Sequence, residues 1–373
     1  MEPFNGDFIQ RHARAAALFN DIHVIHVTYD YPDKEDNPGQ ELNNTGQLTE
    51  HIIYFKKKKS VKAKLTNQLR WLALYKKAIR NYIIKNGKPD LVHVHVPFKA
   101  GILGLWIKRN YKIPYLVTEH WGIYNNLIED NYVSRGIAFK RYTKKIFQQA
   151  SQFISVSDYL AKGVNRLVGK KEYEVIPNTV NTDLFFYKEK ENSSLRFIHV
   201  SNMVPLKNAE GILRSFKKFI QQYGNVELIM IGDKGSVIRN YAKSLDFPIG
   251  ALRFLGEIPY TQVAAEMQKA DCLILFSDIE NSPCVIGEAL CCGLPVITTN
   301  IGGIPELVDQ SNAIMIEPKD EESLTQAMHE MIEGINKYDR KKIAENAIGK
   351  FSYSVIGKQI NVVYGEVLAS LKQ

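Results

Sequence analysis

Residues 280–297, ENSPCVIGEALCCGLPVI, say more about the fold than any other part of the sequence. They follow an apolar run at residues 272–276, which is typical of a buried strand. Ser282 is a suitable N-cap, Pro283 suits the first helical position, and Gly293 suits the position just past a helix C-terminus. The pattern therefore predicts a short helix that begins at the carboxyl end of a strand.

Two carboxylates flank the start of this helix. Glu280 comes just before it, and Glu288 lies about a turn and a half inside it. Ligands of α/β sheets bind at the carboxyl ends of the strands, and a helix N-terminus there favours an anion. Carboxylates would repel that anion unless they accept hydrogen bonds from hydroxyl groups, such as the vicinal diols of a ribose or a hexose. Taken alone, the spacing favours the simpler interpretation of a solvated loop residue and an exposed helix residue.

Short apolar runs alternate with helical patterns along the chain, which predicts parallel sheets covered on both faces. Strands are expected at residues 22–28, 51–55, 90–94, 115–118, 153–156, 173–176, 196–200, 226–231, 252–255, 272–276 and 295–298. Helices are expected at residues 68–84, 137–149, 209–222, 261–270, 284–292, 323–334 and 354–371. Polar stretches at 181–194 and 336–350 interrupt the pattern. The fold class is therefore α/β, with two doubly wound domains in tandem and a final helix that can cap either one.

The composition is that of a globular protein, with 45% hydrophobic and 24% charged residues among 373. The longest uncharged apolar stretch, residues 289–297, is much shorter than the roughly 20 residues that a membrane-spanning helix needs. The first seven residues have neither the basic region nor the apolar region of a signal peptide. All four cysteines lie between Cys272 and Cys292, which is no disulfide framework. We therefore expect a reducing, cytoplasmic location.

The formal net charge of +8 is unevenly distributed. Residues 1–187 hold 28 Lys and Arg against 17 Asp and Glu, whereas residues 188–373 hold 20 against 23. Residues 56–88 contain twelve basic residues and no acidic one. A basic amphipathic helix there can lie on an anionic membrane, or it can be a crossover helix with a solvated lysine face. Nucleic acid is not an expected partner, because no recognition motif is present.

Several motifs together resemble those of the retaining glycosyltransferases of family 4, which have the GT-B fold. Residues 288–297, EALCCGLPVI, match the family's E-A-x-A/C-x-G-x-P-V-I element after the E-x7-E spacing. Residues 300–308, NIGGIPELV, match its G-G-x-x-E-x-V loop, and residues 254–258, FLGEI, resemble its F-x-G-x-V element. Residues 117–120, VTEH, resemble its strand ending in a histidine, and residues 5–12, NGDFIQRH, its glycine-containing loop and first helix. The resemblance covers nearly the whole chain.

This resemblance implies a GT-B architecture, with two Rossmann-like doubly wound domains that face each other across a cleft. The N-terminal acceptor-side domain would comprise residues 1–187 and be completed by the C-terminal helix at residues 352–373. Residues 188–351 would form the domain that binds the nucleotide sugar. The implied reaction moves a sugar from a nucleotide-diphosphate sugar to a glycan or lipid-linked glycan, with retention of configuration and without a metal. The implied location is cytoplasmic, with an anionic membrane surface as a candidate partner at the inner face.

The resemblance also implies roles for individual residues. Lys207 matches the lysine that neutralises the leaving diphosphate, and charge of that kind does stabilise such a transition state. Glu280 would hold hydroxyls of the donor sugar, Glu288 the ribose, and His120 would line the donor sugar at the cleft. The implied donor site has further members in Gly6, Asn202, Ile258, Ser282, Pro283 and Cys284. The simpler interpretations are a solvated lysine and a partly buried histidine.

One position departs from the family pattern. The family usually has an arginine five residues before the lysine, and Asn202 stands there in this chain. Asparagine donates hydrogen bonds but carries no charge, so the diphosphate site lacks one cation. Arg253 or the basic first domain is a candidate replacement. A nucleotide-sugar-binding relative without catalysis is therefore the alternative function. A dinucleotide-dependent oxidoreductase is disfavoured, because no G-x-G-x-x-G follows a first strand.

No cofactor or metal is expected from the sequence. It contains no Asp-x-Asp pair. His93 and His95 alternate on a predicted strand and therefore share one face, but a metal site needs a third ligand, which the sequence does not place. We interpret both histidines as structural. The cysteines have no C-x-x-C spacing and are expected to pack as small apolar residues.

The chain is also expected to lack the first strand of its N-terminal domain. A family member begins with an apolar strand that leads into the glycine-containing loop, whereas Gly6 follows only five residues here. Those residues are too few for a buried strand, and Pro3 has no N–H group to donate. Residues 22–28 would then be the family's second strand. The expected consequences are low stability and exposed strand edges, with a truncated sequence or a start placed too far downstream as the cause. The alternative is a sheet that closes up with one strand fewer.

Overall fold

The computed structural model describes residues 6–29, 39–58, 63–190 and 195–371. The chain divides into two compact units. The first comprises Met1–Val156, Leu160–Pro177 and Tyr353–Gln373, and the second comprises Ser157–Tyr159 and Asn178–Ser352. In the described part of the chain, no helix is both long enough and apolar enough to cross a membrane.

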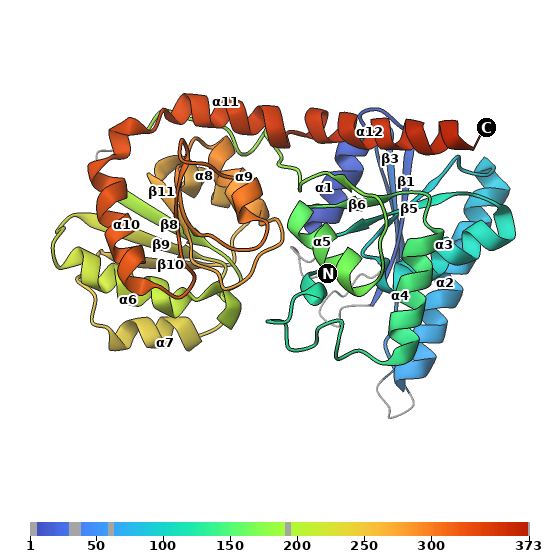
Figure 1. Cartoon of the computed structure of the whole chain (residues 1–373), viewed down its shortest axis with the longest axis horizontal. Coiled ribbons are helices and arrows are strands. Elements are labelled where there is room, and N and C mark those ends of the chain that lie inside the picture. The colour runs from blue at the N-terminus through green and yellow to red at the C-terminus, as the bar shows by residue number, and fades with distance from the viewer. Residues whose placement is uncertain (1–5, 30–38, 59–62, 191–194, 372–373) are drawn as a thin grey trace. The chain divides into compact units, whose positions relative to one another are not determined.

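The second unit is a six-stranded parallel sheet with helices on both faces (Figure 1). Its strands are β8 (Leu195–Val200), β9 (Val226–Ile231), β10 (Leu252–Gly256), β11 (Cys272–Leu275), β12 (Val296–Thr299) and β13 (Ala313–Ile316). One face is covered by α6 (Ala209–Ile220), α7 (Val237–Ser244) and α10 (Glu321–Glu333). The other is covered by α8 (Tyr260–Lys269), α9 (Cys284–Cys291) and α11 (Arg340–Phe351).

The strand order of this sheet is β10-β9-β8-β11-β12-β13. The chain therefore winds outward in one direction from β8 and in the other direction from β11. These two strands lie side by side, with Cys272 of β11 opposite Phe197 of β8. Such a reversal leaves a crevice at the carboxyl ends of the two strands, which is where open α/β sheets bind their ligands. The doubly wound α/β class is thus confirmed for this unit.

Among the described residues, the strands of the first unit form two sheets. One has the order β1-β3-β2 and the other the order β4-β5-β6-β7. Their strands are β1 (Ile22–Tyr29), β2 (Gln40–Thr45), β3 (Leu48–Phe55), β4 (Val92–His95), β5 (Tyr115–Glu119), β6 (Phe153–Ser155) and β7 (Glu174–Val175). The helices are α1 (Asp7–Ala16), α2 (Ala63–Asn86), α3 (Pro97–Tyr111), α4 (Ile137–Gln149), α5 (Asp158–Leu167) and α12 (Tyr353–Ser370).

Helices cover both faces of the second of these sheets. α12 packs with α1 against one face, where Leu116 and Ile154 are buried beneath Ile356 and Ile360. The contact between these helices is close, because a Cβ atom at Gly357 would lie 2.1 Å from the carbonyl oxygen of Ala15. α3, α4 and α5 cover the other face (Figure 1).

Several elements are absent from the sequence-based prediction. α11 lies in the stretch 336–350 that looked only polar, because two of its four buried residues are alanines, Ala344 and Ala347, which give a weak apolar signal. β2 is a polar strand that pairs antiparallel with β3 across the tight turn at Gly46, so pairing and not composition makes it a strand. The prediction also omitted α3, α5, α7 and β13.

The expected absence of a first strand concerns residues 1–5, which lie outside the described residues. Gly6 is the first residue of the described chain and directly precedes α1. Two neighbouring sheets in one unit are nevertheless unusual for a doubly wound domain, in which one continuous sheet is the rule.

Candidate active site

Two loops meet where the strand order reverses in the second unit. One follows β8 and carries Lys207, and the other follows β11 and carries Glu280. The Nζ atom of Lys207 lies 2.5 Å from Oε1 of Glu280. The loops also touch through their backbones, because Asp278 donates its N–H group to the carbonyl of Leu206 at 2.8 Å. The two predicted residues, 73 positions apart, therefore form one charged pair at the topological switch point.

Glu280 is held in place from several directions. Its side chain accepts a 2.8 Å hydrogen bond from the hydroxyl of Ser277 in addition to the contact with Lys207. Its backbone carbonyl accepts from the N–H group of Gly303 at 3.2 Å. Gly302 has φ +57°, and a Cβ atom there would lie 1.9 Å from the carbonyl oxygen of Glu280. The paired glycines of this loop are thus required by its close approach to Glu280.

The loop that carries Lys207 is shaped by a buried histidine at the end of β8. His199 Nδ1 lies 2.9 Å from the carbonyl oxygen of Ile274, so this nitrogen carries the proton. Its Nε2 atom then accepts from the hydroxyl of Ser201 at 2.7 Å, and Ser201 Oγ accepts from the N–H group of Met203. Burial and, to a smaller extent, the charge of Lys207 together lower the pKa of His199 to about 4. A neutral imidazole therefore fixes the first turn of the loop.

The N-cap of α9 lies one residue further along the chain than predicted. Pro283, not Ser282, is the N-cap, and no side chain caps the helix. Ser282 is instead held through its carbonyl, which accepts a 2.7 Å hydrogen bond from the side chain of Asn178. Cys284 is the first helical residue. At the other end Gly293 has φ +75°, and the N–H groups of residues 293 and 294 bond back to residues 290 and 289 in a Schellman motif.

The two carboxylates are not surface residues. Glu280 is 8% exposed and Glu288 is 3% exposed, so the simpler interpretation of two solvated side chains is wrong. Ile258, which follows β10, is half-buried against the apolar core of the α8 and α9 face. The cysteines are packed as expected, and burial raises the pKa of Cys272 well above its usual range. Of the predicted donor residues in this unit, Asn202 is exposed.

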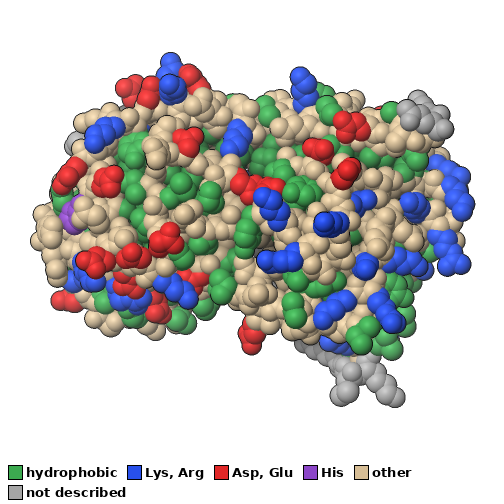
Figure 2. All heavy atoms as spheres, in the orientation of Figure 1, with side chains coloured by type: hydrophobic (Ala, Val, Ile, Leu, Met, Phe, Trp, Pro, Cys, Tyr) green, Lys and Arg blue, Asp and Glu red, His purple; other side chains and the backbone are tan. Residues whose placement is uncertain are grey.

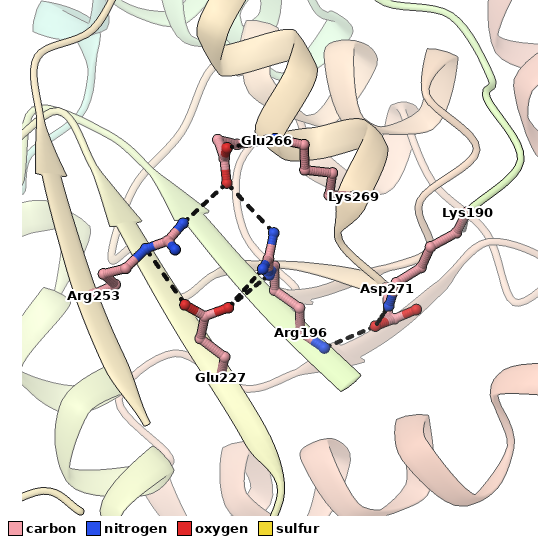
Figure 3. Close-up of polar contacts among 7 residues, drawn as sticks. All are labelled: Lys190, Arg196, Glu227, Arg253, Glu266, Lys269 and Asp271. Atoms are coloured by element: carbon pink, nitrogen blue, oxygen red, sulfur yellow. Dashed lines mark hydrogen bonds and ion pairs between the residues drawn. The ribbon is translucent and has the colours of Figure 1, made fainter. Parts of the chain in front are cut away.

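Arg253 does not replace the cation that Asn202 lacks. Its guanidinium contacts Glu227 at 3.4 Å and Glu266 at 3.3 Å. Arg196 bridges the same two carboxylates, as Figure 3 shows. Arg196 and Arg253 are each the second residue of their strands, β8 and β10, so this network lies at the amino ends of the sheet. Lys207 and Glu280 lie at the opposite, carboxyl ends.

The network has a structural role that the sequence did not reveal. Asp271 directly precedes β11 and accepts hydrogen bonds from the Lys190 ammonium at 2.6 Å and from the backbone N–H group of Arg196 at 2.7 Å. Lys269 adds a contact of 3.1 Å to Glu266 (Figure 3). These contacts tie together the starts of β8, β9, β10 and β11.

In the first unit, His120 directly follows β5. Its Nε2 atom lies 3.0 Å from Nδ1 of His95, and its ring centre is 4.7 Å from that of Phe8. Glu119 supports this turn, because its carboxylate accepts from the N–H groups of His120 and Trp121, each at 2.9 Å. Burial raises the pKa of Glu119 to about 7. Gly6, the other predicted residue of this unit, is the N-cap of α1 with φ +88°.

His120 belongs to a group of three histidines that the sequence did not predict. One nitrogen each of His12, His95 and His120 lie within 4.8 Å of one another, from α1, β4 and the turn after β5. Three imidazoles at this spacing can hold a metal ion, and they are the only such group among the described residues. His93 does share a face with His95, as expected, with ring centres 4.1 Å apart. It bonds to Thr118 and Tyr364 instead.

The surfaces of the two units differ in charge. On the face shown in Figure 2, Lys and Arg side chains gather over the first unit, whereas acidic and basic side chains mix over the second. This matches the excess of eleven positive charges in residues 1–187. Within α2, Lys76 and Arg80 lie over the ring of Trp106 at 5.3 and 5.6 Å, which fixes two of the basic side chains.

Comparison with known proteins assigns the chain to a family. The family model described as glycosyl transferases group 1 matches residues 181–350, and that described as glycosyltransferase family 4 matches residues 8–184. A putative teichuronic acid biosynthesis glycosyltransferase of Bacillus subtilis is 26% identical over 310 residues, covering 79% of this chain and 74% of its own. The chain thus belongs to the family 4-like glycosyltransferases with the GT-B fold.

Solved structures agree on the fold. Sucrose-phosphate synthase from Thermosynechococcus elongatus superposes with a TM-score of 0.80 at 18% identity, over 98% of this chain and 94% of that chain. HepE of Anabaena, solved in complex with UDP-glucose, superposes with a TM-score of 0.64 at 20% identity, over 86% of each chain. As a member of this family, the protein is a glycosyltransferase that uses a nucleotide-sugar donor.

Proposed function

We propose that the protein transfers a sugar from a nucleoside-diphosphate sugar to a glycan or lipid-linked glycan, with retention of configuration and without a metal ion. The pair of Lys207 and Glu280 at the switch point of the second unit carries this proposal. In the transfer, the bond between the anomeric carbon and the phosphate oxygen breaks, and negative charge develops on the diphosphate. A fixed ammonium group at that place stabilises the charge.

The contact between Lys207 and Glu280 implies that Lys207 changes its ionic partner when the donor binds. Without a donor, Lys207 compensates the buried carboxylate of Glu280. When a diphosphate binds, the ammonium gains a stronger anion, and Glu280 becomes free to accept hydrogen bonds from the hydroxyls of the sugar. Glu288, buried in α9, would accept from the ribose in the same way. Each carboxylate thus has a hydroxyl partner that offsets its repulsion of the donor.

The remaining predicted residues complete the proposed donor site. The N-terminus of α9 would direct the N–H groups that follow Pro283 at the diphosphate. Ser282, Cys284, Ile258 and Asn202 would supply the surrounding wall, and the resemblance to the family assigns His120 and Gly6 to the donor sugar. The solved relative with UDP-glucose supports a uridine donor, and the Bacillus subtilis relative supports a glycan acceptor.

We further propose that the protein works in the cytoplasm at the inner face of the membrane. α2 carries six of the twelve basic residues between 56 and 88, and it exposes Leu65 and Leu69, which are 64% and 58% exposed. Exposed leucines beside lysines are the pattern by which a helix lies on an anionic lipid surface. A lipid-linked acceptor would be within reach there.

The second candidate function is binding of a nucleotide sugar without transfer. The observation that favours it is the exposed Asn202, where the family has a cation, together with the engagement of Arg253 at the far end of the sheet. A weaker diphosphate site would still bind the base and ribose but would stabilise the leaving group less.

One experiment separates the two candidates. The protein is screened by thermal shift against a panel of nucleotide sugars, where a ligand at 100 times its Kd adds about 2.7 kcal/mol of stability. The donor that binds is then incubated with glycan and lipid-linked acceptors in the presence of EDTA, and the anomeric configuration of the product is read by NMR. Transfer with retention in EDTA supports the enzyme. Donor binding without release of the nucleoside diphosphate supports the second candidate.

A further inference from the structure

Three histidines of the first unit converge from elements that are far apart in the sequence. His12 lies in α1, His95 is the last residue of β4, and His120 directly follows β5. β4 and β5 are parallel neighbours, with His95 opposite Thr118, so His95 and His120 lie at the carboxyl ends of adjacent strands. His12 is buried and the other two are half-buried. A small ion can therefore reach the group from solvent.

The spacing of the three rings fits a tetrahedral metal ion. Zinc binds an imidazole nitrogen at about 2.0–2.1 Å, which puts the ring centre about 3.2 Å from the metal and the centres of two such rings about 5.2 Å apart. The ring centres of His12 and His120 are 5.2 Å apart, those of His95 and His120 5.3 Å, and those of His12 and His95 5.7 Å. All three distances thus lie within about 0.5 Å of the value for zinc ligands.

The nitrogen atoms are also close enough for coordination. One nitrogen of each ring lies within 4.8 Å of the others, and Nδ1 of His95 is 3.0 Å from Nε2 of His120. Nitrogen ligands of a tetrahedral zinc ion lie about 3.3 Å apart, so small rotations of the rings complete the site. In the hydrogen bond between His95 and His120, one of the two facing nitrogens carries a proton. Coordination requires the other tautomer of that ring, so that both nitrogens present a lone pair to the metal.

Neighbouring side chains hold the ligands in this arrangement. The carboxylate of Glu119 accepts from the backbone N–H group of His120 at 2.9 Å and fixes the turn after β5. The ring of His93 stacks on that of His95, with ring centres 4.1 Å apart. His93 itself bonds to two hydroxyl groups, so it supports His95 and is not a fourth ligand. Outer contacts of this kind orient the ligands of metal sites and contribute to their affinity.

We propose that His12, His95 and His120 form a binding site for one Zn²⁺ ion. Imidazole ligands suit zinc and other late transition metals, whereas magnesium and manganese prefer carboxylate and carbonyl oxygens. The site therefore differs in chemistry from a magnesium or manganese site on the diphosphate of a donor. Three protein ligands leave the fourth tetrahedral position to a water molecule.

Zinc at this site inhibits the proposed transfer. This consequence, unlike the site itself, rests on the proposed function, in which His120 contacts the donor sugar. A nitrogen that ligates zinc has no lone pair left for a sugar hydroxyl, and the ring can no longer turn, so the ion and the donor compete for His120. The protein thereby responds to free zinc although it uses no metal in the transfer.

The test measures zinc binding directly and without a donor. Zinc is titrated in competition with a chromophoric chelator against the full chain and against His12→Gln, His95→Gln and His120→Gln. We expect one equivalent per chain, and binding at least about 10-fold weaker in each variant, because losing a ligand should cost no less than losing an outer contact. His329→Gln is the matched control, since it removes a half-buried histidine of α10 in the second unit. Equal zinc affinity of all these proteins, or equal affinity of the full chain for Mg²⁺, would overturn the proposal.

The unsubstituted chain supplies a second readout that does not depend on how the variants fold. With Co²⁺ in place of Zn²⁺, it should show the intense visible absorption of a tetrahedral cobalt site. The weak absorption of hydrated, octahedral cobalt would contradict the site.

Inhibition is tested separately. Zinc should slow sugar transfer by the unsubstituted chain, EDTA should restore it, and His95→Gln, which retains His120, should lose this inhibition. Zinc binding without inhibition would contradict the competition at His120 and leave the metal site standing. A chain that transfers sugar but binds no zinc would overturn the metal site and leave the proposed function untouched.

Discussion

The ammonium of Lys207 lies 2.5 Å from the carboxylate of Glu280 across the switch point of the second sheet. Both side chains are largely buried, at 24% and 9% exposure. Each charge therefore stabilises the other, since a buried carboxylate without its cation would be costly.

Lys207→Ala should reduce both activity and stability. Removing the ammonium leaves Glu280 buried with Ser277 as its remaining side-chain donor, which should lower the free energy of unfolding by about 1–3 kcal/mol. Turnover should fall by at least about 100-fold, because the leaving diphosphate loses its cation. Lys269→Ala is the matched control, since it removes an exposed lysine from an ion pair at the opposite end of the sheet. Near-wild-type turnover in Lys207→Ala and in Glu280→Ala would contradict the proposed site.

Gly302→Ala should disrupt the position of Glu280. The new Cβ atom would lie 1.9 Å from the Glu280 carbonyl oxygen and would occupy a backbone with φ +57°. We expect the free energy of unfolding to fall by about 1–3 kcal/mol and donor affinity to fall with it, as measured by urea unfolding and calorimetry. Gly349→Ala, in α11 with open space around it, should instead add roughly 0.5–1 kcal/mol. Equal effects of the two substitutions would show that the Gly302 contact is not strained.

Asn202→Arg should strengthen the diphosphate site. A guanidinium five residues before Lys207 adds a charge-assisted hydrogen bond of about 1.5–3 kcal/mol, or roughly 10- to 100-fold in Kd for the nucleoside diphosphate. Asn202→Gln keeps the amide and should leave the Kd unchanged. The Kd values are compared by isothermal titration with the diphosphate and with the nucleoside alone, whose affinity should not change. A gain of equal size for the nucleoside would mean that the new side chain acts elsewhere.

The stability of the second unit should fall in acid because of His199. Its folded-state pKa is depressed to about 4 from an ordinary value of 6.5, so folding disfavours the protonated form. The contribution is complete above pH 6.5 and is lost as the pH falls from 6.5 to about 4, at up to ~1.4 kcal/mol per pH unit. His199→Asn retains an N–H donor near Ile274 but does not titrate. Between pH 6.5 and 4, unfolding of the His199→Asn variant should take up about one proton fewer than unfolding of the wild type, so its free energy of unfolding should change less with pH. If the free energies of the two proteins change equally with pH, His199 is not the group responsible.

Membrane binding should depend on the exposed leucines of α2. Co-sedimentation with vesicles should require anionic lipid and weaken with salt, and a double substitution of Leu65 and Leu69 by Glu should abolish it. Ile249→Glu is the control, because this side chain is fully exposed in the second unit. Equal binding to neutral vesicles, or none to anionic ones, would reject the membrane role.

The sequence by itself determined the local elements and the class of protein. Helix 137–149 and strand 226–231 were predicted with the bounds that α4 and β9 have, because their apolar periods are regular and their ends are marked by turns. The E-x7-E spacing and the glycine after it indicated the glycosyltransferase family. This signal is local, because a short helix at the end of a strand needs particular residue types at its own two ends. Gly293 follows the end of its helix as predicted, since glycine by its own chemistry tolerates a positive φ.

Only the tertiary structure decided which distant residues meet. The contact of Lys207 with Glu280 joins loops 73 positions apart, and the group of His12, His95 and His120 draws on three elements. Arg253 shows the limit of sequence reasoning most clearly. Its charge would allow it to replace the cation that Asn202 lacks, but its place at the amino end of β10 excludes that role. Likewise the division of the described strands of the first unit into two sheets depends on strand pairing, which is a long-range property.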